Sequence, residues 1–133
     1  MSRYTKANLR EVEDQAARFG LSPNLEGRFA TIALELRNSA MTYQRLAPNF
    51  RFPFGHRQTR QEEVYVVLGG SARVKFDDEI LELGPWDALR VAPATVRCFE
   101  GGPEGVEMLA FGAPNTGPSP GADAEVVTDF WTD

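Results

Sequence analysis

The sequence predicts one all-β domain, an antiparallel β-sandwich or barrel, with a short arm or helix at its N-terminus. From residue 28 onward, short runs of β-branched and aromatic residues alternate at regular spacing with Gly, Pro, Asn and Asp, which is typical of such folds. The 133 residues, 42% of them hydrophobic and 25% charged, match the size and composition of a single globular domain. We therefore expect an arm at residues 1–27, a barrel at 28–113 and a tail at 114–133.

The arm carries a short helical pattern. Apolar residues recur at close to helical spacing between residues 9 and 19. Asn8 is a suitable N-cap, and Gly20 is a suitable C-terminal residue. The pattern predicts a short helix or an irregular arm, followed by a turn at the sequence LSPN.

Short strands are expected to make up the barrel. Residues 47–55 are rich in Pro and aromatic side chains, so they predict an extended loop or an edge strand. Turns are expected at the sequences GGSA and GGPEG, because clustered glycines usually interrupt a strand. The strands themselves are expected at residues 28–36, 41–46, 62–68, 73–76, 80–83, 88–92, 96–100 and 106–112.

The tail combines a mobile segment with an anchor. Residues 113–124 are rich in Gly, Pro and Ser, a composition typical of mobile chain. Phe130 and Trp131 follow, and full burial of one large apolar side chain contributes about 1.5–3 kcal/mol. We therefore expect these two residues to dock on the barrel or on a neighbouring subunit.

Composition excludes several classes of partner. The net charge is -5 and the basic residues are scattered, which argues against nucleic acid, whose recognition needs many phosphate contacts, and against an acidic membrane surface. The sequence has no apolar run near the ~18 residues that cross a membrane and no apolar signal core at its start. A single cysteine, Cys98, forms no internal disulfide, which fits a reducing compartment. We expect a cytoplasmic protein.

The strongest chemical pattern is the sequence HRQTRQEEVYVVLGG. It contains the only histidine, His56, then a polar run, then Glu63 at the start of an apolar strand and Gly70 at its end. This segment resembles the first motif of the cupin family, with Gln58 at the position of that motif's second histidine. The resemblance extends over residues 47–113. It implies a cupin antiparallel β-barrel, also called a double-stranded β-helix or jelly roll, of the small single-domain type.

The resemblance also assigns a metal position. Cupin metal ions are typically held by three histidines and one glutamate, and these positions correspond here to His56, Gln58, Glu63 and Arg97. Gln58 offers only a neutral amide oxygen, and Arg97 is a permanent cation without a lone pair. A divalent ion beside Arg97 would be repelled. We therefore expect a degenerate metal site and no cofactor. The alternative is weak binding of a divalent transition metal by His56, Gln58 and Glu63.

The same residues define an expected pocket. If Glu63 points into the barrel, Tyr65 does so too, because alternate residues of a strand share a face. A buried carboxylate needs a partner, so we expect an ion pair between Glu63 and Arg97 in the space of the metal. Glu62 is expected to face solvent, and Cys98 to face away from the pocket. The expected lining is His56, Gln58, Glu63, Tyr65, Arg97, Phe99 and Tyr43.

This pocket allows three functions. The first is metal-independent binding of a small molecule, with Arg97 facing a ligand carboxylate or phosphate. The second is a metal-free isomerase with His56 as the catalytic acid or base, because imidazole exchanges protons near neutral pH. The third is a metal-dependent oxygenase-like or isomerase-like enzyme with an incomplete ligand set. Purely structural roles stand beside these: His56 as a solvated residue at the barrel mouth, and the ion pair as a stabilising contact. The sequence names no substrate and leaves open whether the protein is an enzyme.

A homodimer is the expected assembly. Small cupins commonly form dimers through edge strands, and two-fold symmetry is the commonest closed arrangement. The arm and the sequence DFW in the tail are the candidate contacts.

Overall fold

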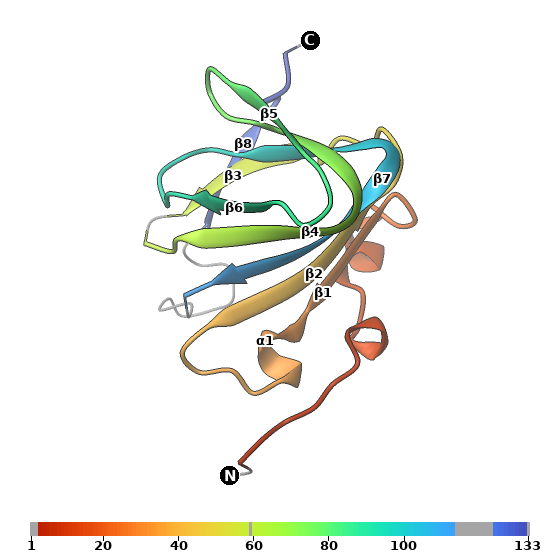
Figure 1. Ribbon diagram of the computed structural model, residues 1–133, viewed down its shortest axis with the longest axis vertical. Helices are drawn as coiled ribbons and strands as arrows, with labels where there is room; N and C mark the ends of the chain where they lie inside the picture. The colour runs from red at the N-terminus through yellow and green to blue at the C-terminus, as the bar shows by residue number, and fades with distance from the viewer. Residues whose placement is uncertain (1–2, 59, 114–123, 133) are drawn as a thin grey trace.

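The computed structural model describes residues 3–58, 60–113 and 124–132. These residues form an antiparallel β structure with very little helix (Figure 1). A six-stranded sheet has the order β1-β2-β7-β4-β5, with β6 paired to β4, and a two-stranded sheet joins β3 to β8. Within the described residues the strand pairings do not close into a ring. The strands are β1 Leu25–Phe29, β2 Ala40–Leu46, β3 Phe54–Gln58, β4 Glu63–Lys75, β5 Ile80–Leu83, β6 Ala88–Val91, β7 Cys98–Gly112 and β8 Ala124–Thr128.

Two long strands, β4 and β7, organise the molecule. The first half of β4 pairs with β6 and its second half with β5, while β7 pairs with β4 along both halves. The register between β4 and β7 shifts at residues 67–69 and 70–72, where β-bulges increase the local bend. Gly70 and Gly105 both have positive φ, and a side chain on Gly70 would collide with the Gly105 carbonyl oxygen. Glycine is therefore required where the two strands bend together.

The predicted turns at GGSA and GGPEG are wrong. Both sequences lie inside continuous strands, β4 and β7, because the bulges accommodate the glycines while the pairing continues on either side. The predicted strand at residues 28–36 is also wrong beyond Phe29. The helical turn α1 (Ala30–Ala33) follows there, with Leu34 N–H donating to the Ala30 carbonyl. Local hydrogen bonds replace a sheet ladder in this segment.

The N-terminal arm contains two short 3₁₀ helices, η1 (Leu9–Glu11) and η2 (Gln15–Phe19), in place of one helix. The expected ends are confirmed: the Asn8 side chain caps η1, and Gly20 ends η2 with φ 71. Asp14 divides the two helices, because its carboxylate accepts hydrogen bonds from the backbone N–H groups of Ala16 and Gly27. The second bond ties the arm to β1.

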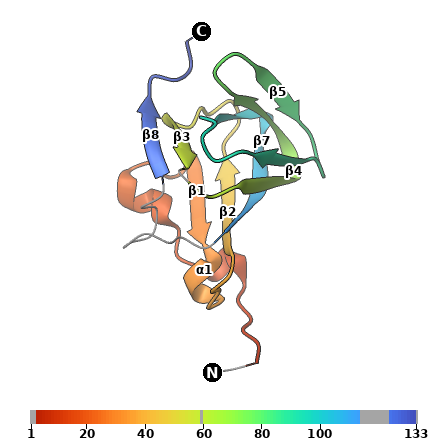
Figure 2. The same cartoon turned by 90° about the vertical axis from the view of Figure 1, so that its left-hand side faces the viewer.

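The C-terminal residues dock on the same chain, as expected. Strand β8 lies beside β3 (Figure 2). The Lys75 ammonium lies 4.0 Å from the Phe130 ring centroid, and the Arg51 and Arg73 guanidinium groups lie 4.5 and 5.2 Å from that of Trp131. Such cation–π contacts contribute about 0.5–2 kcal/mol each. The predicted mobile segment falls mostly at residues 114–123, outside the described residues.

The core lies between the bent strands. Its most deeply buried apolar side chains are Leu46, Tyr65, Val67, Val74 and Met108. Those in β4 and β7 alternate with half-buried residues, as the two-residue period of a strand requires. None of the helices in the described part of the chain has the length and apolar character that crossing a membrane requires.

Candidate functional site

The candidate site centres on the Glu63 carboxylate, which begins strand β4. Glu63 Oε1 accepts hydrogen bonds from three described side chains: Tyr65 O–H at 2.6 Å, Arg97 Nη2 at 2.6 Å and His56 Nε2 at 3.2 Å. His56 belongs to β3, and its backbone exchanges hydrogen bonds with Arg97, which precedes β7. Strand pairing therefore brings together groups that are far apart in sequence. The predicted ion pair between Glu63 and Arg97 is confirmed.

Arg97 is completely buried, and its guanidinium is engaged on several sides. Besides the bond to Glu63, Nε donates to Tyr65 Oη at 3.2 Å, and Nη1 donates to the carbonyl oxygens of Thr95 at 2.8 Å and Pro93 at 3.3 Å. Five donors in a fixed plane suit this arrangement, which a lysine could not reproduce. Arg97 therefore presents no surface to a ligand, contrary to the expectation that it meets a ligand carboxylate or phosphate.

The site holds Glu63 in its charged form. Burial alone raises the pKa of the Glu63 carboxyl, but the hydrogen bonds from His56 and Tyr65 and the charges of His56 and Arg97 outweigh burial and lower the pKa to about 2. Burial and the neighbouring Glu63 charge raise the pKa of Tyr65, so its phenol stays protonated and donates. The result is a compact network with one buried cation and one ionised carboxylate.

Gln58 belongs to the same region but is not part of this network. It follows His56 by two residues on β3, so both side chains lie on the same face of the strand. The residue is only 8% exposed, and its side-chain Oε1 is buried without a hydrogen-bond partner among the described residues. Its backbone N–H donates to the Pro93 carbonyl, which also accepts from Arg97. The exposed surface at the network belongs to His56 and Glu63, whose side chains are 27% and 17% exposed.

Two further predicted residues lie in different places. The Phe99 ring packs against Tyr65 with a centroid distance of 4.7 Å, so it forms an apolar wall of the network. Tyr43 pairs with Leu109, whereas Tyr65 pairs with the next residue, Ala110, so the two tyrosines point to opposite faces of the sheet. The Tyr43 hydroxyl donates to Glu107 at 2.6 Å, away from the Glu63 network.

Other details were partly foreseen. Glu62 is exposed, as predicted, and it also pairs with Arg90. Cys98 is buried with its thiol directed at the carbonyl oxygens of Phe52 and Phe54, and burial raises its pKa, so it is a poor nucleophile. Sequence reasoning missed the carbonyl partners of Arg97, because every residue carries a carbonyl and no sequence signal marks the two that point inward.

The residues present do not fit a cupin metal ion. Among the described residues, no group of three or more His, Cys, Asp and Glu is arranged to hold a metal. At the network, one imidazole and one carboxylate face a buried guanidinium, which would repel a divalent ion. Stable zinc and iron sites require three or four good ligands. The donor set is therefore unsuited to a transition metal.

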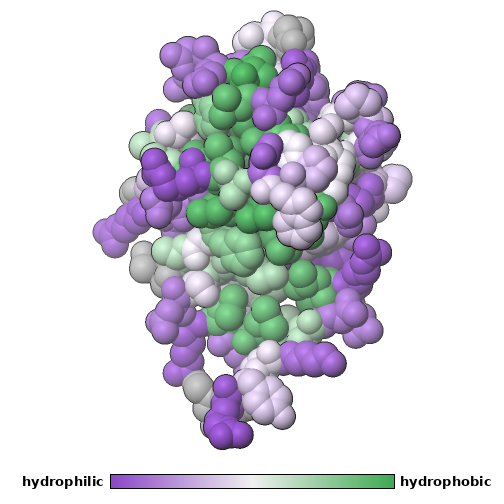
Figure 3. Space-filling model, viewed as in Figure 1, coloured by the Kyte–Doolittle hydropathy of each residue, from purple (hydrophilic) through white to green (hydrophobic). Residues whose placement is uncertain are grey.

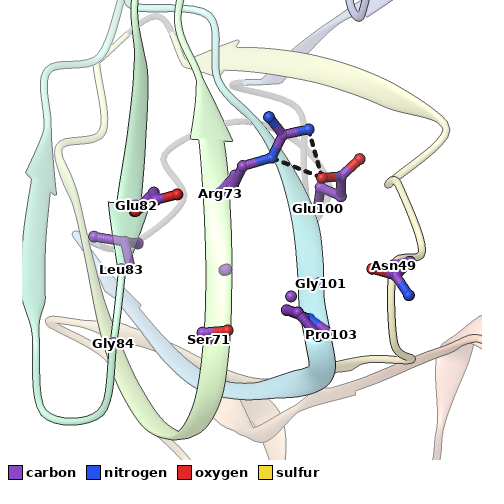
Figure 4. A pocket seen from close by; sticks show the side chains of 11 residues that line it. Asn49, Ser71, Arg73, Glu82, Leu83, Gly84, Glu100, Gly101 and Pro103 are labelled. Atoms are coloured by element: carbon purple, nitrogen blue, oxygen red, sulfur yellow. Dashed lines mark hydrogen bonds and ion pairs between the residues drawn. The ribbon is translucent and has the colours of Figure 1, made fainter.

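A pocket of about 530 Å³ lies elsewhere, between β4, β5 and β7 (Figure 4). Arg73 and Glu100 line it and form an ion pair at 2.7 Å, while Ser71, Glu82 and Asn49 provide further polar groups. None of the predicted site residues lines this pocket. Two of its charged groups, Arg73 and Glu100, are paired with each other.

Comparison with solved structures identifies similar folds. A cupin protein from Bacteroides fragilis matches with a TM-score of 0.70 and 21% sequence identity, over 90% of this chain and 91% of that chain. Oxalate decarboxylase from Bacillus subtilis matches with a TM-score of 0.73 and 19% identity over 94% of this chain, and a variant of it with 0.73 and 18% over 97%. This chain spans only about a third of the oxalate decarboxylase chain. Identities this low support a shared fold and nothing finer.

Comparisons of sequence alone find no relative. No protein-family model matches the chain. No curated protein matches it either.

Proposed function

This chain has the cupin fold, and we propose that it binds a small molecule inside the barrel, beside Glu63, without a metal ion. One observation carries the proposal: the buried Arg97 guanidinium lies 2.6 Å from Glu63 Oε1. The cupin resemblance assigns Arg97 to a metal-ligand position, so a permanent cation takes the place that a metal would need. The side chain thus supplies the positive charge that balances Glu63.

The ion pair also suits a rigid binding site. Arg97 is tied to Tyr65, Thr95 and Pro93 as well as Glu63, so the carboxylate is held in one orientation. Phe99 adds an apolar wall beside Tyr65. Apolar walls with a few oriented polar groups are the usual form of a small-molecule site. His56 and Glu63 supply the accessible polar surface.

Elemental analysis tests the metal-independent proposal directly. The protein should be purified without a histidine tag, because a tag contributes metal ligands of its own. We expect far less than one transition-metal ion per chain. One tightly held ion per chain would overturn the proposal in favour of a metal-dependent oxygenase-like or isomerase-like enzyme, the alternative that the likeness to oxalate decarboxylase raises.

A metal-free isomerase is the second candidate, favoured by the pairing of His56 with Glu63. The two side chains lie 3.2 Å apart, and a carboxylate in this position orients the imidazole for proton transfer. His56 is partly exposed, so it would be the catalytic residue that touches substrate. Loss of activity in His56→Gln with the melting temperature unchanged would support this role once a substrate is known.

We also propose a homodimer and a cytoplasmic location. Met41 and Val64 both pair with Phe111, so three apolar residues of adjacent strands share one face of the six-stranded sheet. Hydrophobic side chains run along the middle of the molecular face over β4, β7 and β2 (Figure 3). A second copy of the chain is the proposed occupant. Sedimentation that shows only monomer at micromolar concentration would contradict the proposed dimer.

The buried free thiol of Cys98 supports the proposed location, because a reducing compartment keeps thiols free.

A further inference from the structure

Within the part of the chain that the structure describes, two hydrogen-bond acceptors at the candidate site have no partner. Gln58 Oε1 is buried without a partner. The three hydrogen bonds to Glu63 all end on Oε1, and among the described residues none ends on Oε2. Buried polar groups in folded proteins almost always form hydrogen bonds, so an unpartnered amide inside a barrel calls for a physical explanation.

The side chains that carry the two acceptors belong to one region of the interior. His56 and Gln58 are two residues apart on β3, so their side chains share a face, and the His56 side chain reaches Glu63. The backbone of Gln58 and the side chain of Arg97 both donate to the Pro93 carbonyl, which joins them to one segment. The carboxamide of Gln58 therefore belongs to the same interior as the carboxylate of Glu63.

We infer that the ligand of this site, whose existence rests on the proposed function, donates hydrogen bonds through hydroxyl or N–H groups and is neither a carboxylate nor a phosphate. An anionic ligand would bring its oxygens against the Glu63 carboxylate, which only accepts hydrogen bonds and carries a like charge. Arg97, the cation of the network, is fully buried and already donates to Glu63, Tyr65 and two carbonyls. A hydroxyl or amino group satisfies both acceptors without disturbing the ion pair.

Three small probes of equal length test the ligand class: propanediol, diaminopropane and malonate, each with its two functional groups on the terminal carbons. They are titrated into the full ¹⁵N-labelled chain at millimolar concentration while the backbone amide resonances of His56, Gln58 and Arg97 are followed. We expect saturable shifts with the diol, the diamine or both, and none with malonate. Tighter binding of the diol would indicate a neutral natural ligand, and tighter binding of the diamine would indicate a cationic one.

The variant Gln58→Leu separates recognition from structure. It removes the unpartnered amide but leaves the ion pair of Glu63 and Arg97 intact. We expect the shifts to disappear and the melting temperature to stay the same or rise, because an unsatisfied buried group is replaced by an apolar one. Gln15→Leu, the same change in helix η2 of the arm, is the matched control and should leave the shifts unchanged.

Each adverse result has a distinct meaning. Saturable shifts with malonate overturn the ligand class but leave metal-independent binding intact. No shift with any probe overturns the inference, since solvent then satisfies both acceptors. A lower melting temperature in Gln58→Leu also overturns it, because the amide would then be a structural group. The proposed function itself fails on a different measurement, the discovery of one bound metal ion per chain.

Discussion

Arg97 Nη2 donates to Glu63 Oε1 across 2.6 Å and joins two segments 34 residues apart in sequence. The first segment begins strand β4, and the second leads into strand β7. The bond therefore ties the start of β4 to the segment that precedes β7 and pairs two opposite charges in the interior. The contribution of this ion pair to the free energy of unfolding and its effect on metal binding can be measured separately.

Arg97→Leu is expected to lower the free energy of unfolding by about 3–5 kcal/mol, because it leaves the Glu63 carboxylate without its buried partner. Urea denaturation measures the change. The matched control is Arg90→Leu, which breaks the exposed pair with Glu62 and should cost less than about 1 kcal/mol. Equal losses in the two variants would contradict a buried, strongly coupled pair.

The stability of the protein is expected to fall in acid through Glu63. Its pKa is lowered from 4.5 to about 2 in the folded state, so its contribution is complete above the unfolded value and is lost as the pH falls from about 4.5 toward 2. The shift corresponds to ~3 kcal/mol, at about 1.36 kcal/mol per pKa unit. Chemical denaturation at a series of pH values measures this loss.

Glu63→Gln provides the comparison for the acid prediction, since it removes the titrating group at this position. The variant is expected to be less stable at neutral pH and to lose less stability between pH values of about 4.5 and 2. Glu62→Gln, at the exposed neighbouring position, should follow the native profile. An acid profile of Glu63→Gln identical to that of the native chain would show that other carboxyls control acid unfolding.

The double variant Q58H/R97H is expected to bind a transition metal far more tightly than the native chain. It removes the permanent cation and places histidines at two positions beside His56 and Glu63, which supplies the three-histidine, one-glutamate ligand set. Titration calorimetry with zinc should give one site per chain. The single variant Q58H keeps Arg97 and is expected to bind far more weakly. Equal affinity in the two variants would show that Arg97 does not oppose the metal.

Trp131→Ala is expected to lower the free energy of unfolding by about 1–3 kcal/mol. The substitution removes an aromatic ring that lies beneath the guanidinium groups of Arg51 and Arg73. Thermal denaturation with calorimetry measures the loss. The control is Trp86→Ala, because Trp86 is 77% exposed and its removal should change stability by less than about 0.5 kcal/mol. A similar effect of both substitutions would contradict the docking of the tail.

Strand alternation made much of the fold predictable. The strands near residues 41–46, 80–83 and 88–92 were found because their apolar periodicity and flanking turn residues agree. The glycines in β4 and β7 were mistaken for turns, because a glycine pair can end a strand or form a bulge within it. The choice between the two depends on a neighbouring strand far away in sequence.

The candidate site, like the fold, was predictable from the sequence only in part. Parity along β4 correctly placed Tyr65 on the face of Glu63, and the charges of Glu63 and Arg97 predicted their pairing. Tyr43 was expected in the pocket, but its face depends on the register of β2 against β7, which no local pattern specifies. The unpartnered amide of Gln58 was equally hidden, since hydrogen-bond satisfaction is a property of the packed interior.

The sequence by itself determined the strand periodicity, the single histidine and the permanent cation at residue 97, a position that the cupin resemblance assigns to a metal ligand. Only the tertiary structure decided that Arg97 is fully buried, that the hydrogen bonds to Glu63 converge on one oxygen, and that Gln58 Oε1 has no partner among the described residues. The physical reason is that residue chemistry and alternation are local. Burial and hydrogen-bond partners arise only when strands distant in sequence lie side by side.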